Sequence, residues 1–156
     1  MALIKAKGYH VGSVWEQPVA WGESDSFRHI NNVHYARYAE SGRIRFMEQM
    51  ALDTKGPQGV KDLLAGQGIG LILKKLTINY RRPVVYPDTL LIAQKPHTLE
   101  PTAFSHTTLF YSLAHNKPVA TAESVCVWYD YERFCKTEGP TEMVEWLQRC
   151  MDKTDS

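Results

Sequence analysis

The sequence contains few cysteines, and their arrangement gives no sign of covalent or metal cross-links. Cys126, Cys135 and Cys150 are the only three among 156 residues, and no two of them form a Cys-x-x-Cys pair. We therefore expect neither a disulfide framework nor a zinc site. This cysteine usage favours a reducing compartment. The six histidines are scattered and form no ligand-like pair with an acid, so we expect no metal.

Long apolar runs and an excess of one charge are also missing. No apolar run approaches the roughly 18 residues that suggest a membrane span, and the first residues lack the apolar core of a signal peptide. The net charge of +1 indicates neither nucleic acid nor a membrane surface as a partner. We expect a cytoplasmic protein. The start Met-Ala-Leu-Ile-Lys-Ala-Lys is basic and free of acids, which keeps a mitochondrial location open.

The composition that remains is ordinary for one globular domain. The hydrophobic fraction is 44% and the charged fraction 22%. A chain of this length buries roughly two-thirds of its unfolded surface. Since neither a repeat nor a low-complexity linker divides the chain, we expect a single domain over residues 1–156.

One long helix is predicted in the first third of the chain. Tyr35, Ala39, Gly42, Phe46 and Met50 recur at helical spacing, which predicts a helix over about 32–50. Asn31 or Asn32 is a suitable N-cap for it. The other expected elements are an edge strand at 13–21 that contains Pro18, a polar loop at 22–31, a Gly- and Pro-rich connection at 53–68 with a short helical turn at 60–65, strands at 69–82, 88–95, 102–115 and 118–131, and a helix at 141–151.

This order predicts an α+β fold with an antiparallel sheet. A second apolar stripe on the helix, formed by Val33, Ala36, Ile44 and Met47, suggests that the sheet wraps around it. Residues 90–93 are apolar on both faces of their strand, and a single helix covers only one face. We therefore expect the chain to self-associate.

The segment from Asp25 to Glu40 carries the clearest chemistry. Asp25 lies in the polar loop, seven residues before the helix is expected to begin, and Glu40 projects from that helix. A carboxylate near the free N–H groups of a helix start suits attack on a carbonyl, because those groups stabilise an oxyanion. The chain offers neither a serine-elbow glycine pattern, nor a cysteine close to a motif histidine, nor a phosphate-binding glycine loop.

The same segment resembles a known family. The pattern Asp25-x-x-x-His29-x-Asn31-Asn32-x-x-Tyr35-x-x-Tyr38-x-Glu40-x-x-Arg43 is similar to the signature of 4-hydroxybenzoyl-CoA-type acyl-CoA thioesterases. A supporting match follows in Ile78-Asn-Tyr80-Arg-Arg82-Pro83-x-x-x-Pro87-Asp88-x-Leu90. The likeness spans about residues 12–138 and implies the hotdog fold, a curled antiparallel sheet wrapped around one long helix.

The resemblance also implies roles for individual residues. Asp25 matches the catalytic carboxylate, as nucleophile or general base, and the backbone N–H groups of Asn32 and Val33 would polarise the thioester carbonyl. His29, Asn31 and Tyr35 match positions that shape the loop and the acyl pocket. The family needs no cofactor and works as a homodimer or a homotetramer, with its active sites between subunits.

Other charged residues allow two interpretations each. Glu40 is a second catalytic acid or an ion-pair partner of Arg37 or Arg43 on the helix surface. The basic cluster of Lys74, Lys75, Arg81 and Arg82 binds coenzyme A phosphates or forms a solvated face.

Two positions depart from the family pattern. Arg28 stands where many members have Gly, and a left-handed backbone there is more costly for Arg. Pro87 replaces the Gly of a Gly-Asp turn, which predicts another turn type.

We therefore expect a thioesterase that hydrolyses an acyl-CoA of lipid metabolism to a free acid and coenzyme A. Two rival functions stay open: a hotdog hydratase or dehydratase acting on 3-hydroxyacyl thioesters, and a non-catalytic protein that binds acyl thioesters. The first rival requires a His and an acid facing each other across the pocket. The second predicts binding without turnover.

Overall fold

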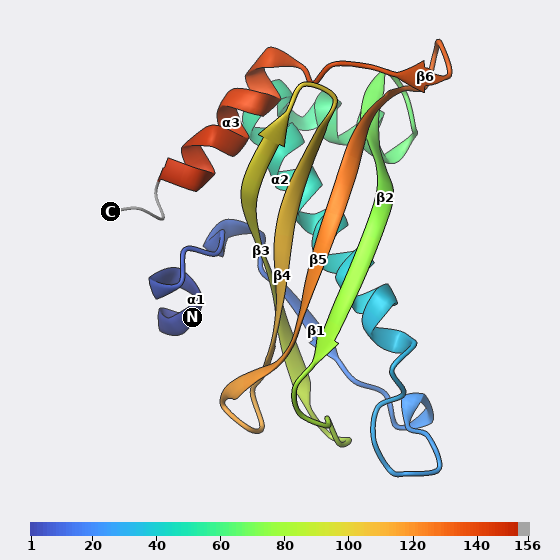
Figure 1. Cartoon of the computed structure of the whole chain (residues 1–156), viewed down its shortest axis with the longest axis vertical. Helices are drawn as coiled ribbons and strands as arrows, with labels where there is room; N and C mark the ends of the chain where they lie inside the picture. The colour runs from blue at the N-terminus through green and yellow to red at the C-terminus, as the bar shows by residue number, and fades with distance from the viewer. Residues whose placement is uncertain (153–156) are drawn as a thin grey trace.

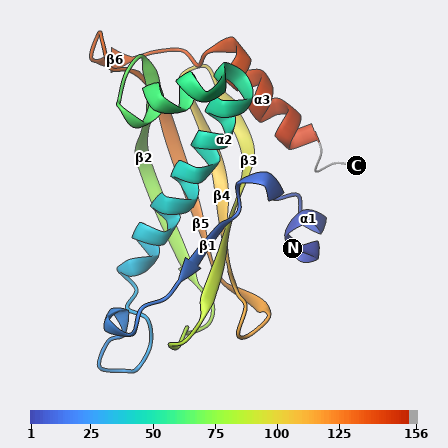
Figure 2. The ribbon, with the colours of Figure 1, turned by 180° about the vertical axis from the view of Figure 1, so that it is seen from behind.

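A computed structural model describes residues 1–152 and shows one antiparallel sheet with a long helix across one face (Figures 1 and 2). The strands follow the order β1–β3–β4–β5–β2, and β6 pairs with β5. Their bounds are β1 Trp15–Pro18, β2 Ile69–Tyr80, β3 Thr89–Glu100, β4 Ala103–Ser112, β5 Lys117–Asp130 and β6 Cys135–Lys136. The predicted antiparallel α+β architecture is confirmed.

The long helix α2, His34–Leu64, packs on the sheet through the predicted apolar stripe. Tyr35, Ala39, Phe46 and Met50 are all buried. A Cβ at Gly42 would collide with Ile92 Cγ2, so the small residue lets the helix approach β3 closely. Burial against the sheet offsets the roughly 1 kcal/mol that a glycine costs in a helix interior.

A buried polar set interrupts the apolar contact between α2 and the sheet. One apolar cluster surrounds Tyr35 and Phe110 near the start of α2, and a second surrounds Phe46 and Trp128 farther along it. Buried polar side chains occur on α2 and on the strands beneath it. This buried polar set consists of Arg43, Gln94, His106, Thr108 and Ser124.

The predicted connection over 53–68 is wrong for most of its length. Residues 53–64 belong to α2, which is kinked at Gly56 (φ 69°, ψ −168°). Gly56 takes a backbone conformation that suits only glycine, and Pro57 resumes the helix at a first-turn position, where its missing N–H costs nothing. Two residues typical of loops thus make a kink instead of ending the helix.

Several other bounds also differ from the expectation. The edge strand is confined to Trp15–Pro18, with 3₁₀ turns η1 (Val11–Ser13) and η2 (Trp21–Glu23) on either side. The N-cap of α2 is Val33, not an asparagine, and no side chain caps it. β3 continues past Pro96 through a register shift to Glu100. The two-residue strand β6 was not predicted.

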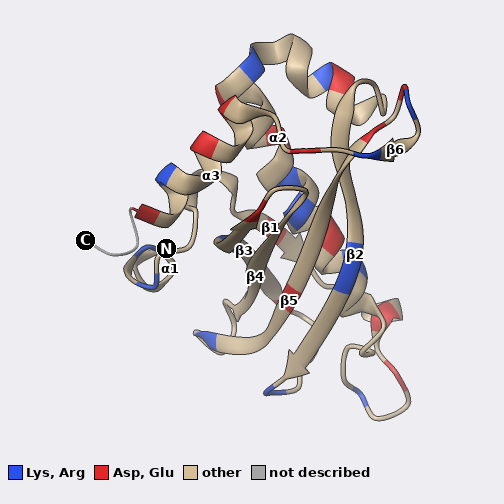
Figure 3. Ribbon diagram, turned by 45° about the horizontal axis from the view of Figure 1, so that its top comes forward, with Lys and Arg blue, Asp and Glu red and all other residues tan. Residues whose placement is uncertain are grey.

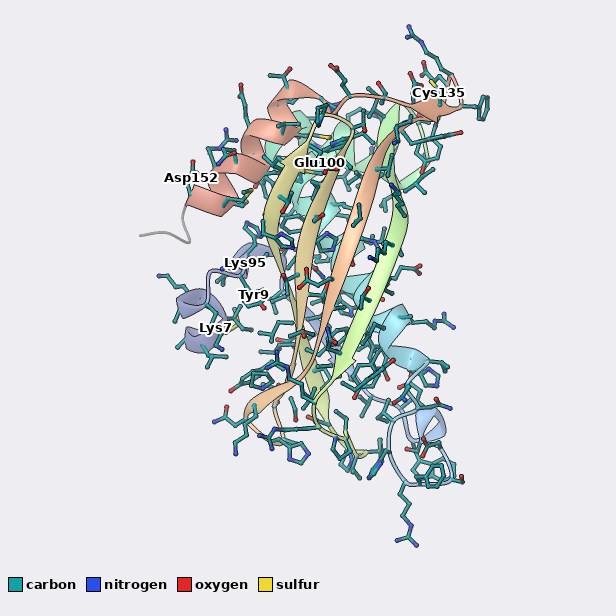
Figure 4. The ribbon with its side chains drawn as sticks, in the orientation of Figure 1. Lys7, Tyr9, Lys95, Glu100, Cys135 and Asp152 are labelled. Atoms are coloured by element: carbon teal, nitrogen blue, oxygen red, sulfur yellow. The ribbon has the colours of Figure 1, made fainter. Side chains whose placement is uncertain are left out.

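The N-terminal segment covers part of the sheet face that α2 leaves open. Helix α1 (Ala2–Ala6) places Ile4 against Leu91 and Leu109, and Tyr9 joins this cluster. Lys95 Nζ on β3 donates a hydrogen bond to the Lys7 carbonyl at 3.1 Å, and Figure 4 shows the two residues side by side. Contrary to the expectation, residues 90–93 need no second subunit for cover, since the chain covers both faces of this segment itself.

The C-terminal helix α3, Thr141–Asp152, agrees with the expected helix at 141–151. Met143, Trp146 and Leu147 are buried on its inner face. The indole N–H of Trp146 donates to Asp53 Oδ2 of α2 at 2.9 Å and ties the two helices together. Within residues 1–152, the helices are all too short or too polar to cross a membrane.

Candidate active site

Asp25 lies in a small loop that closes on itself. Ser24 and Ile30 form an isolated bridge, and the Asp25 N–H donates to the His29 carbonyl at 2.8 Å. Asp25 Oδ1 accepts the backbone N–H of Phe27 at 2.8 Å and, more weakly, that of His29 at 3.4 Å. These bonds fix the carboxylate and leave Oδ2 without a hydrogen-bond partner in the described part of the chain.

The loop is hydrogen bonded to the turn between β2 and β3 on one side and to η2 on the other. Ile30 N–H donates to the Val84 carbonyl at 2.8 Å, and Asn31 N–H donates to the Glu23 carbonyl at 2.9 Å. Ile30 itself is buried in the apolar cluster near the start of α2. Asp25 is therefore held on rigid elements, which a catalytic group requires.

Arg28 occupies the left-handed region, with φ 65°. The resemblance placed Arg here in the position of a family glycine, and the structure shows the backbone conformation for which glycine is favoured. Such a conformation costs a non-glycine residue about 1–2 kcal/mol.

We expect Arg28→Gly to be more stable than Arg28→Ala by about 0.5–1 kcal/mol. Both changes remove the same charged side chain, but only glycine adopts the left-handed backbone conformation without strain. Part of this stabilisation is offset, because glycine also raises the conformational entropy of the unfolded chain. Urea unfolding of the two variants, followed by tryptophan fluorescence, measures the difference. Equal stabilities, or a more stable alanine variant, would contradict this account of the loop.

The start of α2 presents one free backbone donor beside this loop. Val33 N–H donates to Asn31 Oδ1 at 3.4 Å, whereas Asn32 N–H meets no acceptor among residues 1–152. The Tyr80 hydroxyl donates to the Asn32 carbonyl at 3.0 Å and so joins this turn to the end of β2. Of the two amides proposed for the oxyanion, only that of Asn32 is unengaged.

Glu23 is a structural residue of the site that the sequence analysis missed. Its Oε2 accepts the Tyr38 hydroxyl and the Ala20 N–H, at 2.5 and 2.7 Å, and His34 Nδ1 lies 3.8 Å from Oε1. Burial and the hydrogen bond to Glu23 raise the pKa of Tyr38. The motif contains Tyr38, but only the folded chain brings it to Glu23, fifteen residues earlier.

A cavity of about 560 Å³ unites most of the predicted site residues, and we call it the basic cavity. Burial and the nearby Tyr80 and Asp88 raise the pKa of Tyr35 to about 12. The backbone N–H groups of Arg81 and Arg82 donate to the Val119 carbonyl at 2.9 and 3.1 Å, which anchors both arginines. The predicted residues that line the basic cavity are Asp25, His29, Asn32, Tyr35, Arg81 and Arg82.

The other predicted residues lie elsewhere. Asn31 is half-buried behind the loop, and Val33 is exposed at the N-cap. Glu40 is exposed on α2 and forms no ion pair within the described residues, so neither Arg37 nor Arg43 is its partner. Lys74 is exposed in the middle of β2, where Figure 3 shows basic colour, and it does not line the basic cavity. The residues that the structure describes include no cluster of three or more His, Cys, Asp or Glu suited to a metal.

Solved structures of thioesterases share this fold. The PA2801 protein of Pseudomonas aeruginosa superposes with a TM-score of 0.74 at 22% identity, over 88% of this chain and 99% of that one. The DHNA-CoA thioesterase of Staphylococcus aureus superposes with a TM-score of 0.69 at 15% identity, over 92% and 90%. These likenesses establish the hotdog fold.

Sequence comparisons agree with the fold. The chain is 24% identical over 108 residues to the chloroplastic acyl-acyl carrier protein thioesterase ATL3 of Arabidopsis thaliana, covering 69% of this chain and 53% of that protein. It is 26% identical over 92 residues to the long-chain acyl-CoA thioesterase FadM of Escherichia coli, covering 59% and 54%. The chain thus spans about half the length of these curated relatives. The model of the thioesterase-like superfamily matches residues 19–147, and the chain belongs to that superfamily.

Proposed function

We propose that this protein hydrolyses acyl-CoA thioesters in the basic cavity. The observation that carries the proposal is the meeting of Asp25 and Asn32 in one cavity with Arg81 and Arg82. A fixed carboxylate, a free amide at a helix start and two cations are the groups that thioester hydrolysis on coenzyme A would use. FadM, an acyl-CoA thioesterase that matches part of the chain, supports the choice of substrate.

Each group has a defined role in this mechanism. The thioester carbonyl oxygen accepts the Asn32 N–H, where the positive end of the α2 dipole stabilises the negative charge of the tetrahedral intermediate. Asp25 Oδ2 either attacks the carbonyl carbon or removes a proton from the attacking water. Collapse of the intermediate breaks the C–S bond and releases coenzyme A as a thiolate, which takes up a proton. If Asp25 attacks, the acyl group is left on it as a mixed anhydride, and water then hydrolyses this anhydride to the free acid and the Asp25 carboxylate. If water attacks, the free acid forms directly, and Asp25 returns the proton it took to the thiolate or to solvent. Thiolate is a good leaving group, so the step requires no strong general acid.

The arginines would hold coenzyme A by its phosphates. Arg81 and Arg82 are exposed at the rim of the cavity, and their guanidinium groups can form charge-assisted hydrogen bonds to phosphate oxygens. Lys74 lies farther along β2 and would contribute only at longer range. His29 and Tyr35 form the wall next to Asp25 and would shape the space for the thioester.

Hydrolysis of a panel of acyl-CoA substrates tests the proposal. Free thiol is measured with a thiol-reactive dye for aliphatic chains of two to sixteen carbons and for aromatic acyl groups. We expect turnover of at least one class well above the rate without protein. Tight binding with no release of thiol from any substrate would refute the enzymatic function, and loss of enoyl-CoA absorbance in parallel assays would favour a hydratase.

We further propose that the active protein is a homodimer joined at β2. This strand pairs only with β5 within the described residues, which leaves its other edge open. Ile72 and Leu73 are exposed on it, and Ile44 is exposed on the second stripe of α2. An open edge beside exposed apolar residues favours pairing with a second copy. Sedimentation at micromolar concentration should give at least twice the chain mass of 17.8 kDa, and a monomer would overturn the proposal.

A further inference from the structure

Asp25 also lines a second cavity. It measures about 620 Å³, and Asp25 is the one residue that lines both cavities. Its walls come from η2 and the loop after it, and from the turn between β2 and β3. We call it the aromatic cavity because two aromatic residues, Trp21 and Tyr86, supply its apolar side chains together with Val85.

The apolar residues of this cavity are unusually open to solvent. Trp21 is 76% exposed, Tyr86 46% and Val85 45%. Single apolar residues on a surface need no explanation, but three that line one cavity form a patch of the kind that binds a ligand. Aromatic side chains that keep one apolar face open are well suited to such binding.

Both walls of the aromatic cavity are held in place. On one side, the Ser24 N–H donates to the Trp21 carbonyl at 3.1 Å. On the other side, Asp88 Oδ1 accepts the N–H groups of Thr89 and Ala114, at 2.7 and 3.0 Å, and Asp88 Oδ2 accepts the Ser112 hydroxyl. This clamp fixes the end of the turn that carries Val85 and Tyr86.

The two cavities differ in charge in a way that matches the two halves of an acyl-CoA. The basic cavity has Arg81, Arg82 and His29 in its lining beside five apolar or aromatic residues, whereas the aromatic cavity has Arg28 as its single basic residue. Coenzyme A carries negative phosphates and the acyl group is apolar. A thioester at Asp25 would therefore place coenzyme A on one side of the carboxylate and the acyl group on the other.

We propose that the aromatic cavity binds the apolar acyl group of the substrate, and that Trp21, Val85 and Tyr86 determine which acyl groups are accepted. This inference rests on the proposed thioesterase function and adds a location for the acyl group, which differs from the His29 and Tyr35 side that the family resemblance implies. The contact is apolar in each case, so an alkyl chain and an aromatic ring are both candidates, and they are separate arms of the test.

Filling the cavity tests the inference most directly. A Cβ at Gly22 would meet no atom within 4 Å, so Gly22→Phe can place a ring in the cavity without disturbing the fold. For acyl groups of eight or more carbons and for benzoyl-CoA, whichever class the wild type prefers, we expect kcat/KM to fall at least tenfold through KM. Acetyl-CoA, whose acyl group is too short to reach the ring, should change less than threefold.

Removing a wall provides a second variant in case Gly22→Phe fails to fold. Trp21→Ala deletes an exposed side chain and should lower kcat/KM for the preferred large acyl group about tenfold, with acetyl-CoA again little changed. Trp15→Ala is the matched control, since Trp15 is also an exposed tryptophan but lines neither cavity. Thermal unfolding of each variant verifies that it is folded.

The outcomes separate this inference from the proposed function. A wild type active on acyl-CoA, with Gly22→Phe and Trp21→Ala lowering kcat/KM equally for acetyl and larger substrates, would show that the cavity holds part of coenzyme A and would overturn the inference alone. Unchanged kinetics in both variants would also overturn it. An inactive wild type would refute the thioesterase function, and the acyl site with it.

Discussion

Asp25→Asn is expected to lower kcat for acyl-CoA hydrolysis by about a thousandfold or more, with a much smaller effect on KM. A positioned general base contributes roughly 10²–10⁴-fold to a rate, and loss of a nucleophile costs at least as much. Asparagine keeps an oxygen that can accept the N–H groups of Phe27 and His29, so the loop should persist. The variant thus removes the charge and the reactivity while leaving the local geometry in place.

Two further variants make this result specific. Asp62→Asn makes the same chemical change on an exposed helical turn, where Asp62 accepts the Gln58 amide, and should retain wild-type kinetics. Glu40→Gln removes the other carboxylate that the sequence indicated, and we expect a loss of less than tenfold because Glu40 does not line the basic cavity. Turnover by Asp25→Asn within threefold of the wild type would remove Asp25 from the mechanism. A large loss of turnover in Glu40→Gln would instead identify Glu40 on α2 as the catalytic acid.

Local patterns in the sequence were sufficient to predict the architecture. The apolar stripe from Tyr35 to Met50 identified the central helix and its buried face, because helical spacing is visible within a few turns. The strands were found because alternation and proline or turn residues bracket them. The end of α2 was missed at Gly56 and Pro57, whose backbone preferences suit both a loop and a kink. Only packing of the following turns distinguishes those two outcomes.

Contacts between distant segments could not be predicted in the same way. The cover that Ile4 and Tyr9 give to residues 90–93 depends on where the N-terminal segment returns to the sheet. The hydrogen bond between Tyr38 and Glu23 likewise depends on how the folded chain brings two separate segments together.

The part of the candidate site that lies in one continuous sequence motif could be predicted. Asp25, His29, Asn32 and Tyr35 lie within eleven residues, and all four line one cavity. Arg81 and Arg82 join them because the end of β2 is hydrogen bonded to the helix start through Tyr80, a contact across 48 positions. The aromatic cavity combines η2 with the β2–β3 turn, and no local pattern relates Trp21 to Tyr86.

His106 is one of several scattered histidines in the sequence, and its surroundings make it a pH-sensitive group of the core. It is fully buried on β4, and neither ring nitrogen has a hydrogen-bond partner in the described part of the chain. Burial is the main cause that lowers the pKa of His106 to about 3, and the charges of Arg43 and His97 add to it. Phe46 and Phe104 lie beside the ring and provide no polar contact.

The lowered pKa of His106 makes stability fall as the pH falls. Below about pH 6.5 the unfolded chain binds a proton at this histidine, and the folded chain does not do so until about pH 3. This contribution to stability is therefore complete above pH 6.5 and is lost on acidification, at about 1.4 kcal/mol per pH unit. Between pH 7.5 and 4.5 the loss from His106 amounts to about 2.5 kcal/mol.

His106→Leu should flatten this part of the curve, because it removes the group that takes up the proton on unfolding. Its free energy of unfolding should exceed that of the wild type by an amount that grows by about 2.5 kcal/mol from pH 7.5 to 4.5. At neutral pH the variant should be at least as stable, since two unpartnered ring nitrogens leave the core. Denaturant unfolding at four pH values measures the difference.

His115→Gln is the control, since His115 lies at an exposed turn position, and it should follow the wild-type curve. Parallel curves for His106→Leu and the wild type would mean that the imidazole has the same pKa in the folded and unfolded chain, which would contradict this account.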